Sequence, residues 1–202
     1  MKIMAIADAA SPALWEHYND NKLYDTDLIV SCGDLDPRYL SFLVTCVNVP
    51  LLYVHGNHDE CYDDIPPDGC ICIDDRVYVH NGIRFLGLGG CFPYNKGKYM
   101  YTEAQMKRRI RRVSRQIRKY GGLDVLVTHA PVRGIGDGED LPHRGYQAFI
   151  PLLEKCRPPY MLHGHVHMQY DYTLKRENEY QDTKIINAYE KYFLEIQDGG
   201  AV

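Results

Sequence analysis

The chain has 202 residues, of which 45% are hydrophobic and 25% charged, and its formal net charge is −4. This length suits one well-filled globular domain spanning residues 1–202, and the acidic balance argues against a general nucleic-acid-binding protein. The N-terminus is apolar for only a few residues before Asp8, which is unlike a signal peptide, and no apolar run reaches the length of a membrane span. We therefore expect a cytoplasmic protein without a membrane anchor.

The seven cysteines cannot all pair, and several lie inside apolar runs, where they act as small hydrophobic residues. Cys70 and Cys72 are too close together and too isolated for a zinc framework. We expect reduced thiols throughout.

The first half of the chain alternates strand-like apolar runs with helix signals. Runs 3–7, 27–32 and 51–54 are predicted strands, and Ser11-Pro12 and Asp36-Pro37 are typical of helix N-termini. The residues expected to face inward from these helices are Leu14, Trp15 and Tyr18 in the first and Leu40, Leu43, Val44 and Val47 in the second. This β-α-β-α-β order predicts parallel strands with right-handed crossovers.

From residue 61 onward the pattern changes. A turn cluster at 66–69 precedes predicted strands at 70–73, 76–80 and 83–88, and Asn81-Gly82 between the last two is a strong hairpin signal. Antiparallel strands at this point indicate a second sheet packed on the first. Further strands are predicted at 123–128, 160–162, 170–174, 184–187 and 192–196. The helix marked by Tyr146, Phe149, Ile150 and Leu153 lies between the first two of these.

A loop at 89–101, rich in Gly and Tyr, leads to a capping box formed by Thr102 and Gln105. The helix that follows contains the basic run 107–119, and its apolar stripe indicates an amphipathic surface helix. It has no interleaved aromatic platform for nucleic-acid bases. The tyrosines and lysines of the preceding loop could form a substrate wall or simply cover the sheet: Tyr94, Tyr99, Tyr101, Lys96 and Lys98.

Polar groups that can bind metals stand at the carboxyl ends of five predicted strands. Ligands of open α/β sheets bind in the crevice beyond these ends, so five distant segments are expected to converge there. Gly33, Gly56 and Gly164 allow sharp turns beside the ligand. The polar groups are Asp8, Asp34, Asn57, His129, and the pair His165 and His167.

The segment at 51–60, LLYVHGNHDE, shows the pattern most fully. A buried strand stops at Gly56 and is followed by Asn57 as a neutral oxygen ligand, His58 as a proton donor and Asp59 to orient the imidazole. Oxygen and nitrogen ligands without thiolate suit Mn²⁺, Fe²⁺, Zn²⁺ or Ni²⁺ and do not select among them. Two such ions, about 3.5–4 Å apart, could clamp a phosphate.

The order of these motifs resembles the calcineurin-like metallophosphoesterases over nearly the whole chain. The motifs are Asp8, Gly33-Asp34, Gly56-Asn57-His58-Asp59, His129 and Gly164-His165-Val166-His167. The resemblance implies a four-layer αββα sandwich of two mixed β-sheets flanked by helices. It also implies two divalent transition metal ions and hydrolysis of a phosphomonoester or phosphodiester by a metal-bound hydroxide.

Residue by residue, the resemblance implies that Asp34 bridges both metal ions. Asn57, His129 and His165 would complete one site, and Asp8 and His167 would belong to the other. His58 would be the general acid for the leaving oxygen and Asp59 its orienting partner. His143 and Arg144, in the loop after His129, are candidates for contact with a small phosphorylated substrate.

One motif departs from the family pattern. The family's first block is Asp-x-His, whereas this chain reads Asp8-Ala9-Ala10. Since Ala10 has no donor atom, we expect the first site to be weaker and more hydrated, with a preference for a harder ion. Asp36 could replace the missing ligand, but its place before Pro37 favours a helix N-cap, and His55 is a further candidate.

Two other functions stay open. A non-catalytic metal-binding scaffold of the same fold is favoured by Ala10, and a nuclease using the basic helix is disfavoured by the acidic balance. The sequence does not specify the substrate, the preference for monoester or diester, the native metal or the oligomeric state.

Overall fold

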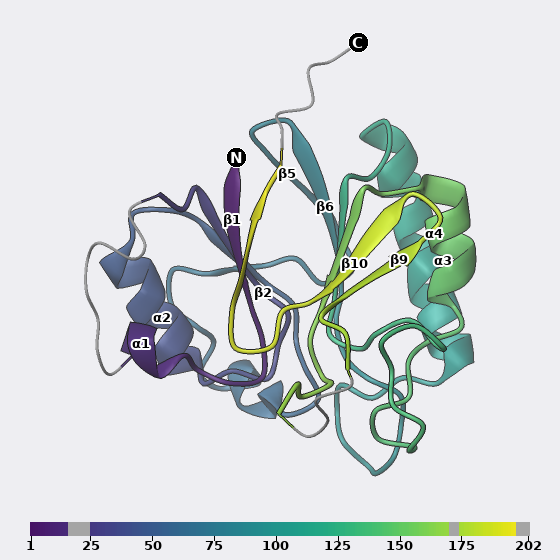
Figure 1. The fold of residues 1–202 in the computed structure, drawn as a ribbon, viewed down its shortest axis with the longest axis horizontal. Coiled ribbons are helices and arrows are strands. Elements are labelled where there is room, and N and C mark those ends of the chain that lie inside the picture. The colour runs from purple at the N-terminus through teal and green to yellow at the C-terminus, as the bar shows by residue number, and fades with distance from the viewer. Residues whose placement is uncertain (16–24, 170–173, 197–202) are drawn as a thin grey trace.

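The computed structural model describes residues 1–15, 25–169 and 174–196, and its centre is a pair of β-sheets (Figure 1). The strands of the first sheet are β1 (Lys2–Ile6), β2 (Leu28–Ser31), β3 (Leu51–Tyr53), β4 (Ile71–Cys72) and β11 (Tyr192–Glu195). Their order across the sheet is β11-β1-β2-β3-β4. β1 to β4 are parallel and β11 pairs antiparallel with β1, so the first half has the parallel arrangement that its sequence predicts.

The second sheet has six strands in the described residues. They are β5 (Val77–His80), β6 (Ile83–Leu88), β7 (Val125–Thr128), β8 (Tyr160–His163), β9 (Glu177–Tyr180) and β10 (Thr183–Asn187). The order is β5-β6-β7-β8-β10-β9, with β6, β7, β8 and β10 parallel and an antiparallel strand at each edge. Both sheets are therefore mixed.

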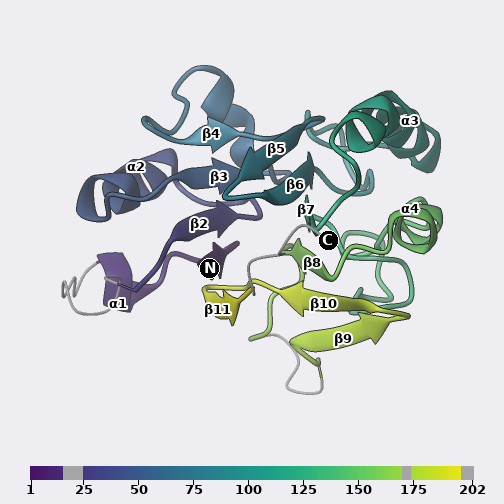
Figure 2. The ribbon, with the colours of Figure 1, turned by 90° about the horizontal axis from the view of Figure 1, so that it is seen from above.

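The helices lie on the outer faces of the two sheets, which face each other in the middle (Figure 2). On the first sheet, Met4 and Ile29 pack with Tyr39, Leu40 and Leu43 of the helical layer. On the second sheet, strands β6, β7, β8 and β10 pack on the other two helices. The helices are α1 (Pro12–Trp15), α2 (Pro37–Cys46), α3 (Glu103–Lys119) and α4 (Phe149–Cys156). The fold is thus the expected four-layer αββα sandwich.

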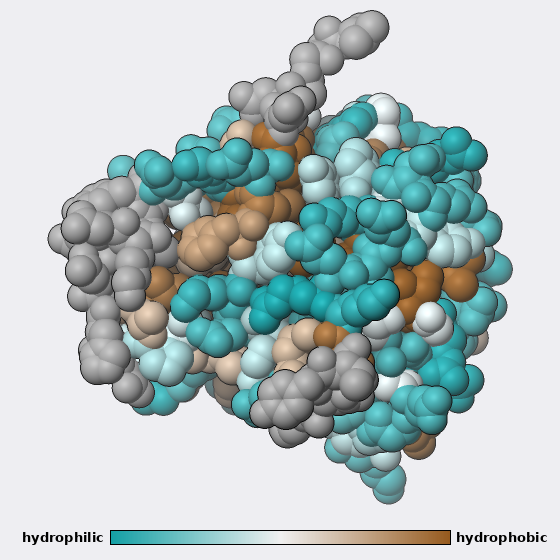
Figure 3. All heavy atoms as spheres, viewed as in Figure 1, coloured by the Kyte–Doolittle hydropathy of each residue, from teal (hydrophilic) through white to brown (hydrophobic). Residues whose placement is uncertain are grey.

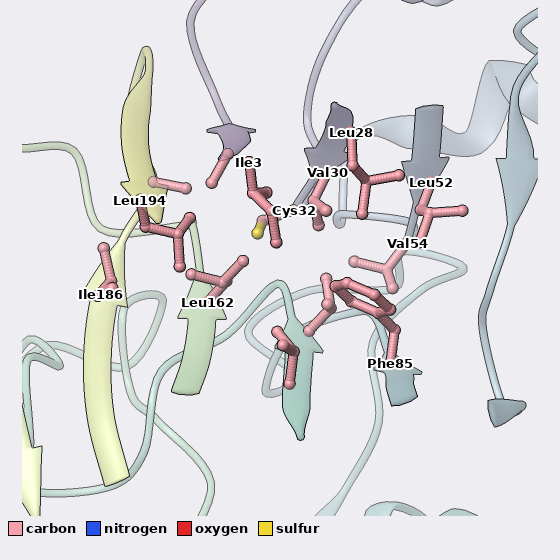
Figure 4. Packing of buried hydrophobic residues seen from close by; sticks show 14 of the residues in the cluster. Ile3, Leu28, Val30, Cys32, Leu52, Val54, Phe85, Leu162, Ile186 and Leu194 are labelled. Carbon is pink, nitrogen blue, oxygen red and sulfur yellow. The ribbon is translucent and has the colours of Figure 1, made fainter. Parts of the chain in front are cut away.

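The main core lies between the two sheets, because alternate residues of each strand point to opposite faces. Ile3, Val30 and Leu52 of the first sheet meet Phe85 and Leu162 of the second (Figure 4). The face of the molecule in Figure 3 is mostly hydrophilic, with hydrophobic residues showing in separate patches. No helix of the described residues is long and apolar enough to cross a membrane.

Several local signals are confirmed. Asp36 is the N-cap of α2, and its carboxylate accepts the backbone N–H of Arg38 at 2.8 Å. Thr102 and Gln105 form the capping box of α3. Asn81 and Gly82 have φ of 48° and 79° and turn β5 into β6. The seven cysteines are all free.

The structure differs from the sequence-based expectation at the start of the first helix and at one strand. The hydroxyl of Ser11 donates to Glu190 at 2.8 Å, and α1 begins on the Ser11 carbonyl instead. Leu14 is buried, Trp15 is 38% exposed against the ring of Tyr39, and Tyr18 lies outside the described residues. The strand predicted at 170–174 falls almost entirely outside them too. An unpredicted strand, β9, lies at the sheet edge with the polar sequence ENEY.

Candidate metal centre

Each of the six predicted ligands lies just beyond the carboxyl end of a strand. Asp8 follows β1, Asp34 follows β2, Asn57 follows β3, His129 follows β7, and His165 and His167 follow β8. The first three come from one sheet and the last three from the other. The two sheets therefore contribute equally to this edge of the molecule.

The backbone is unusual at three of these ligands. Asp8, Asp34 and His165 have φ of 63°, 57° and 69°. L-residues rarely adopt this left-handed conformation, although Asp and His tolerate it better than most. Such conformations persist only where the surroundings impose them, and they are concentrated at functional sites. The turns after β1, β2 and β8 are thus held in less favourable conformations that place a polar side chain.

Gly33 and Gly56 bring the turns after β2 and β3 into close contact. A Cβ on Gly56 would lie 2.0 Å from Asp34 Oδ1, and a Cβ on Gly33 would lie 2.4 Å from the backbone nitrogen of Gly56. Gly33 also has a φ of 95°, which favours glycine. A larger residue at Gly56 would displace Asp34, and one at Gly33 would displace the turn after β3.

Four of the predicted ligands form one compact group. The Nε2 atom of His129 lies 2.9 Å from Oδ1 of Asn57 and 3.3 Å from Oδ2 of Asp34. Asp34, His129 and His165 each offer a ligand atom within 4.8 Å of the others. The His129 side chain is fully buried and that of Asp34 is 9% exposed. This group has the donor types of a transition-metal site.

Outer hydrogen bonds fix which atoms face the centre of this group. The Nδ1 of His129 lies 2.8 Å from the carbonyl of Cys32, and the Nε2 of His165 lies 2.6 Å from the carbonyl of Pro142. Since a carbonyl can only accept, each of these nitrogens donates, which leaves the other ring nitrogen for a metal. The amide of Asn57 donates to the Tyr94 hydroxyl at 3.0 Å, which turns Oδ1 toward His129.

The pKa values of His129 and Asp34 depend on each other. Burial lowers the pKa of His129, but the Asp34 carboxylate outweighs it and raises the value to about 9. Burial raises the pKa of Asp34, but the charge and hydrogen bond of His129 lower it overall. The Nε2 of His129 faces two oxygens that only accept, so a proton or a metal ion must lie between them. The residues present therefore fit a divalent ion.

Asp8 and His167 form a separate pair. Oδ1 of Asp8 lies 3.8 Å from Nε2 of His167, and both carboxylate oxygens accept the backbone N–H of His165, at 2.9 and 3.0 Å. Burial raises the pKa of Asp8 to about 7. Within the described ranges, neither residue belongs to a group of three close ligands, and Ala10 is exposed.

His58 and Asp59 take different places. The backbone N–H of His58 donates to Asp34 Oδ1 at 2.8 Å, and the residue is exposed. Asp59 is buried, and its Oδ2 accepts the backbone N–H groups of Gly56 and Asp34 at 2.7 and 2.9 Å. Burial raises the pKa of Asp59 to about 6. Its carboxylate thus ties the turns after β2 and β3 together, and its predicted action on the His58 ring stays a prediction.

The candidate substrate residues lie at the rim. The ring of His143 is centred 5.5 Å from that of His165, while Arg144 is exposed with its guanidinium 5.2 Å from the Phe92 ring centroid. Of the tyrosine loop, Tyr94 contacts the site through Asn57. Sequence reasoning did not identify Tyr94 as a partner of a ligand, and only the fold brings them together.

His55 and Asp36 do not face the pair of Asp8 and His167 as replacement ligands. The Nδ1 of His55 lies 2.7 Å from Asp74 Oδ2, and the ring stacks on Tyr99 at 4.3 Å. His55, Cys72 and Asp74 form the second close group of potential ligands found in the described residues. Asp36 caps α2 and pairs with Arg38.

Comparisons with known proteins agree with this geometry. Fourteen chains of solved structures match. One is the crystal structure of TT1561 of Thermus thermophilus, with a TM-score of 0.60 and 13% sequence identity over 94% of this chain and 89% of that one. No curated protein matches in sequence. The model of the calcineurin-like phosphoesterases matches residues 1–169. The chain therefore belongs to the calcineurin-like phosphoesterase family, whose members are generally metal-dependent hydrolases of phosphoesters.

Proposed function

We propose that this protein is a metal-dependent phosphoesterase that acts on a small phosphomonoester or phosphodiester. The observation that carries the proposal is the arrangement around His129. Its Nδ1 is held by the Cys32 carbonyl, and its Nε2 faces oxygens of Asn57 and Asp34 that can only accept. A proton on Nε2 would satisfy the same oxygens, but Asp34, His129 and His165 also offer ligand atoms within 4.8 Å of one another, which a divalent ion can use together.

The residues divide into two sets. Asp34, Asn57, His129 and His165 would hold one divalent ion, and Asp8 and His167, with Asp34 shared, would hold the other. When bound, two such ions supply a water nucleophile at neutral pH and offset the charge that develops on the phosphate. The nitrogen and oxygen ligands leave Mn, Fe, Zn and Ni as candidates.

The side chains of this chain perform the remaining steps. His58 is exposed beside Asp34 and would protonate the leaving oxygen. Asp59 fixes the turn that presents His58, because its carboxylate binds backbone N–H groups on both sides of the site. Arg144 is an exposed cation at the rim and would attract the phosphate.

A non-catalytic scaffold is the competing function, since Asp8 and His167 have no third close ligand in the part of the chain that the structure describes. The test is a titration of metal-stripped protein with Mn²⁺ or Zn²⁺, assayed with a nitrophenyl phosphomonoester and a bis-nitrophenyl phosphodiester. We expect metal-dependent turnover of at least one substrate, abolished by a chelator and by His129→Ala. Metal uptake without turnover would favour the scaffold, and no uptake would refute both.

A further inference from the structure

A small cavity lies beside His167, the partner of Asp8. Its volume is about 230 Å³, and its polar lining consists of two imidazoles and two carboxylates: His143, His167, Glu139 and Asp140. No Lys or Arg lines it in the described residues. Carboxylates repel a phosphate and attract a metal ion, so the charge of this cavity suits a cation better than an anionic substrate.

One ring nitrogen of His143 is held by a carboxylate, which leaves the other nitrogen available. Its Nδ1 lies 2.8 Å from Oδ2 of Asp140, and its side chain is 31% exposed. A carboxylate that accepts the N–H of one ring nitrogen fixes the tautomer and makes the other nitrogen a better ligand. The ring lies within reach of both histidines of the β8 motif, because it lines the same cavity as His167 and its centroid is 5.5 Å from that of His165.

The site beside this cavity lacks a ligand. Asp8 and His167 lie 3.8 Å apart, and the position at which the resemblance places an imidazole is occupied by Ala10. The loop that carries His143 follows β7, the neighbour of β8 in the second sheet, and its Pro142 carbonyl binds His165. The residue after Pro142, His143, lines the same cavity as His167, which is assigned to the incomplete site.

We propose that His143 supplies the imidazole that Ala10 cannot, and completes the metal site of Asp8, Asp34 and His167. Asp140 is its positioning residue. This inference rests on the proposed function, since it requires that the centre binds two metal ions. It assigns His143 to the metal, whereas the sequence suggested contact with the substrate.

The test is a stepwise Mn²⁺ titration of metal-stripped full-length protein, followed by calorimetry and by the Mn²⁺ electron paramagnetic resonance signal. We expect His143→Ala to weaken one binding step by at least the roughly 10–100-fold typical of losing an outer partner of a ligand, and Asp140→Asn to weaken the same step less. His167→Ala identifies that step, and His129→Ala identifies the other. Leu141→Ala, an exposed neighbour in the same loop, is the matched control and should change neither step.

Rescue distinguishes a ligand from a merely structural residue. Ala10→His in the His143→Ala background should restore the weakened step, because it returns one imidazole to the same ion. Two normal binding steps in His143→Ala would overturn the inference and leave the proposed function intact. Loss of the His129 step in place of the His167 step would also overturn it. A wild-type protein that takes up no metal would refute the proposed function itself.

Discussion

The two carboxylate oxygens of Asp34 face different neighbours, and the proposed function assigns this side chain to both metal ions. One oxygen accepts the backbone N–H of His58 at 2.8 Å, and the other lies 3.3 Å from His129. We expect Asp34→Ala to abolish activity and to remove metal from both positions, as measured by elemental analysis and a phosphodiester assay. Asp36→Ala is the control, since it removes the α2 cap and an exposed ion pair with Arg38, at a cost of about 1 kcal/mol, and no candidate metal ligand. An Asp34→Ala protein with full metal content would contradict the bridging role.

His58 is the residue whose removal should depend on the leaving group. Since it is assigned to proton transfer, His58→Ala should keep its metal and lose about 10²–10⁴-fold in turnover on substrates with poor leaving groups. The loss should be much smaller for nitrophenyl esters, whose leaving group needs no proton. Rates across a series of leaving groups, with metal content measured in parallel, provide the test. Equal losses across the series would exclude the general-acid role.

The candidate ligands could be predicted from sequence, because each is a polar group placed soon after an apolar strand. The groups that orient these ligands could not be predicted. The carbonyls of Cys32 and Pro142 that orient the two histidines belong to the backbone, so they leave no side-chain signature. The link from Asn57 to the Tyr94 hydroxyl joins residues 37 positions apart and depends on the fold.

In helix α3, sequence predicts the apolar stripe but not the buried arginine beside it. Arg109 is only 6% exposed and belongs to the buried face of the helix. The spacing places Arg109 on the buried face, since it lies three residues after Met106 and four before Val113. Its partners could not be predicted, because Asp74 and Asp75 lie in a turn that is distant in sequence. β9 was missed for another reason: an edge strand needs no apolar face.

Arg109 should contribute strongly to stability. It lies 2.8 Å from Asp75 Oδ1 and 3.4 Å from Asp74 Oδ1, donates to the Gly89 carbonyl at 2.6 Å, and lies over the Tyr101 ring at 4.2 Å. Arg109→Ala removes all of these contacts and leaves Asp74 paired with His55, and we expect a loss of about 1.5–3 kcal/mol in the free energy of unfolding, the range for hydrogen bonds to charged groups. Arg108→Ala, exposed on the same helix, should change it by about 0.5 kcal/mol or less. Urea denaturation of both variants is the measurement, and similar small losses would show that the ion pair contributes little.

The end of β3 is connected to this ion pair through His55. Burial lowers the pKa of His55, but the hydrogen bond to Asp74 outweighs it, together with Cys72, and raises the value to about 9. A raised histidine pKa stabilises the fold fully below the unfolded value of about 6.5, and this contribution is lost as the pH rises through about 9. Urea denaturation of the metal-free protein from pH 6 to 10 should therefore show a steeper decline for wild type than for His55→Gln. Parallel profiles would show that His55 is not charged in the folded state.

For the whole molecule, the β-α-β order predicted the parallel half of the first sheet, and the Asn81-Gly82 hairpin marked the start of the second. The closing strand could not be placed in the same way. β11 pairs with β1 across almost the full length of the chain, with Leu194 opposite Ile3, and no local pattern specifies so distant a partner. The same closure brings the Ser11 hydroxyl to Glu190.

Because the two sheets supply the ligands together, a bound metal ion should act as a cross-link between them. Asp34 and Asn57 come from the first sheet, and His129 and His165 from the second. Binding to the folded state alone adds about 2.7 kcal/mol to the free energy of unfolding at a free metal concentration of 100 Kd. For a chain of this size that corresponds to a rise of about 5–10 °C in Tm.

The measurement is thermal unfolding with increasing Mn²⁺, at concentrations set by the Kd from calorimetry. The rise should be absent in Asp34→Ala, which removes a ligand assigned to both ions, and smaller in His129→Ala, which removes a ligand assigned to only one of them. Arg108→Ala should show the full rise, which controls for unspecific binding of the ion to the surface. A full rise that survives in Asp34→Ala would mean that the ion binds elsewhere, and the group His55, Cys72 and Asp74 would then be the first alternative to test.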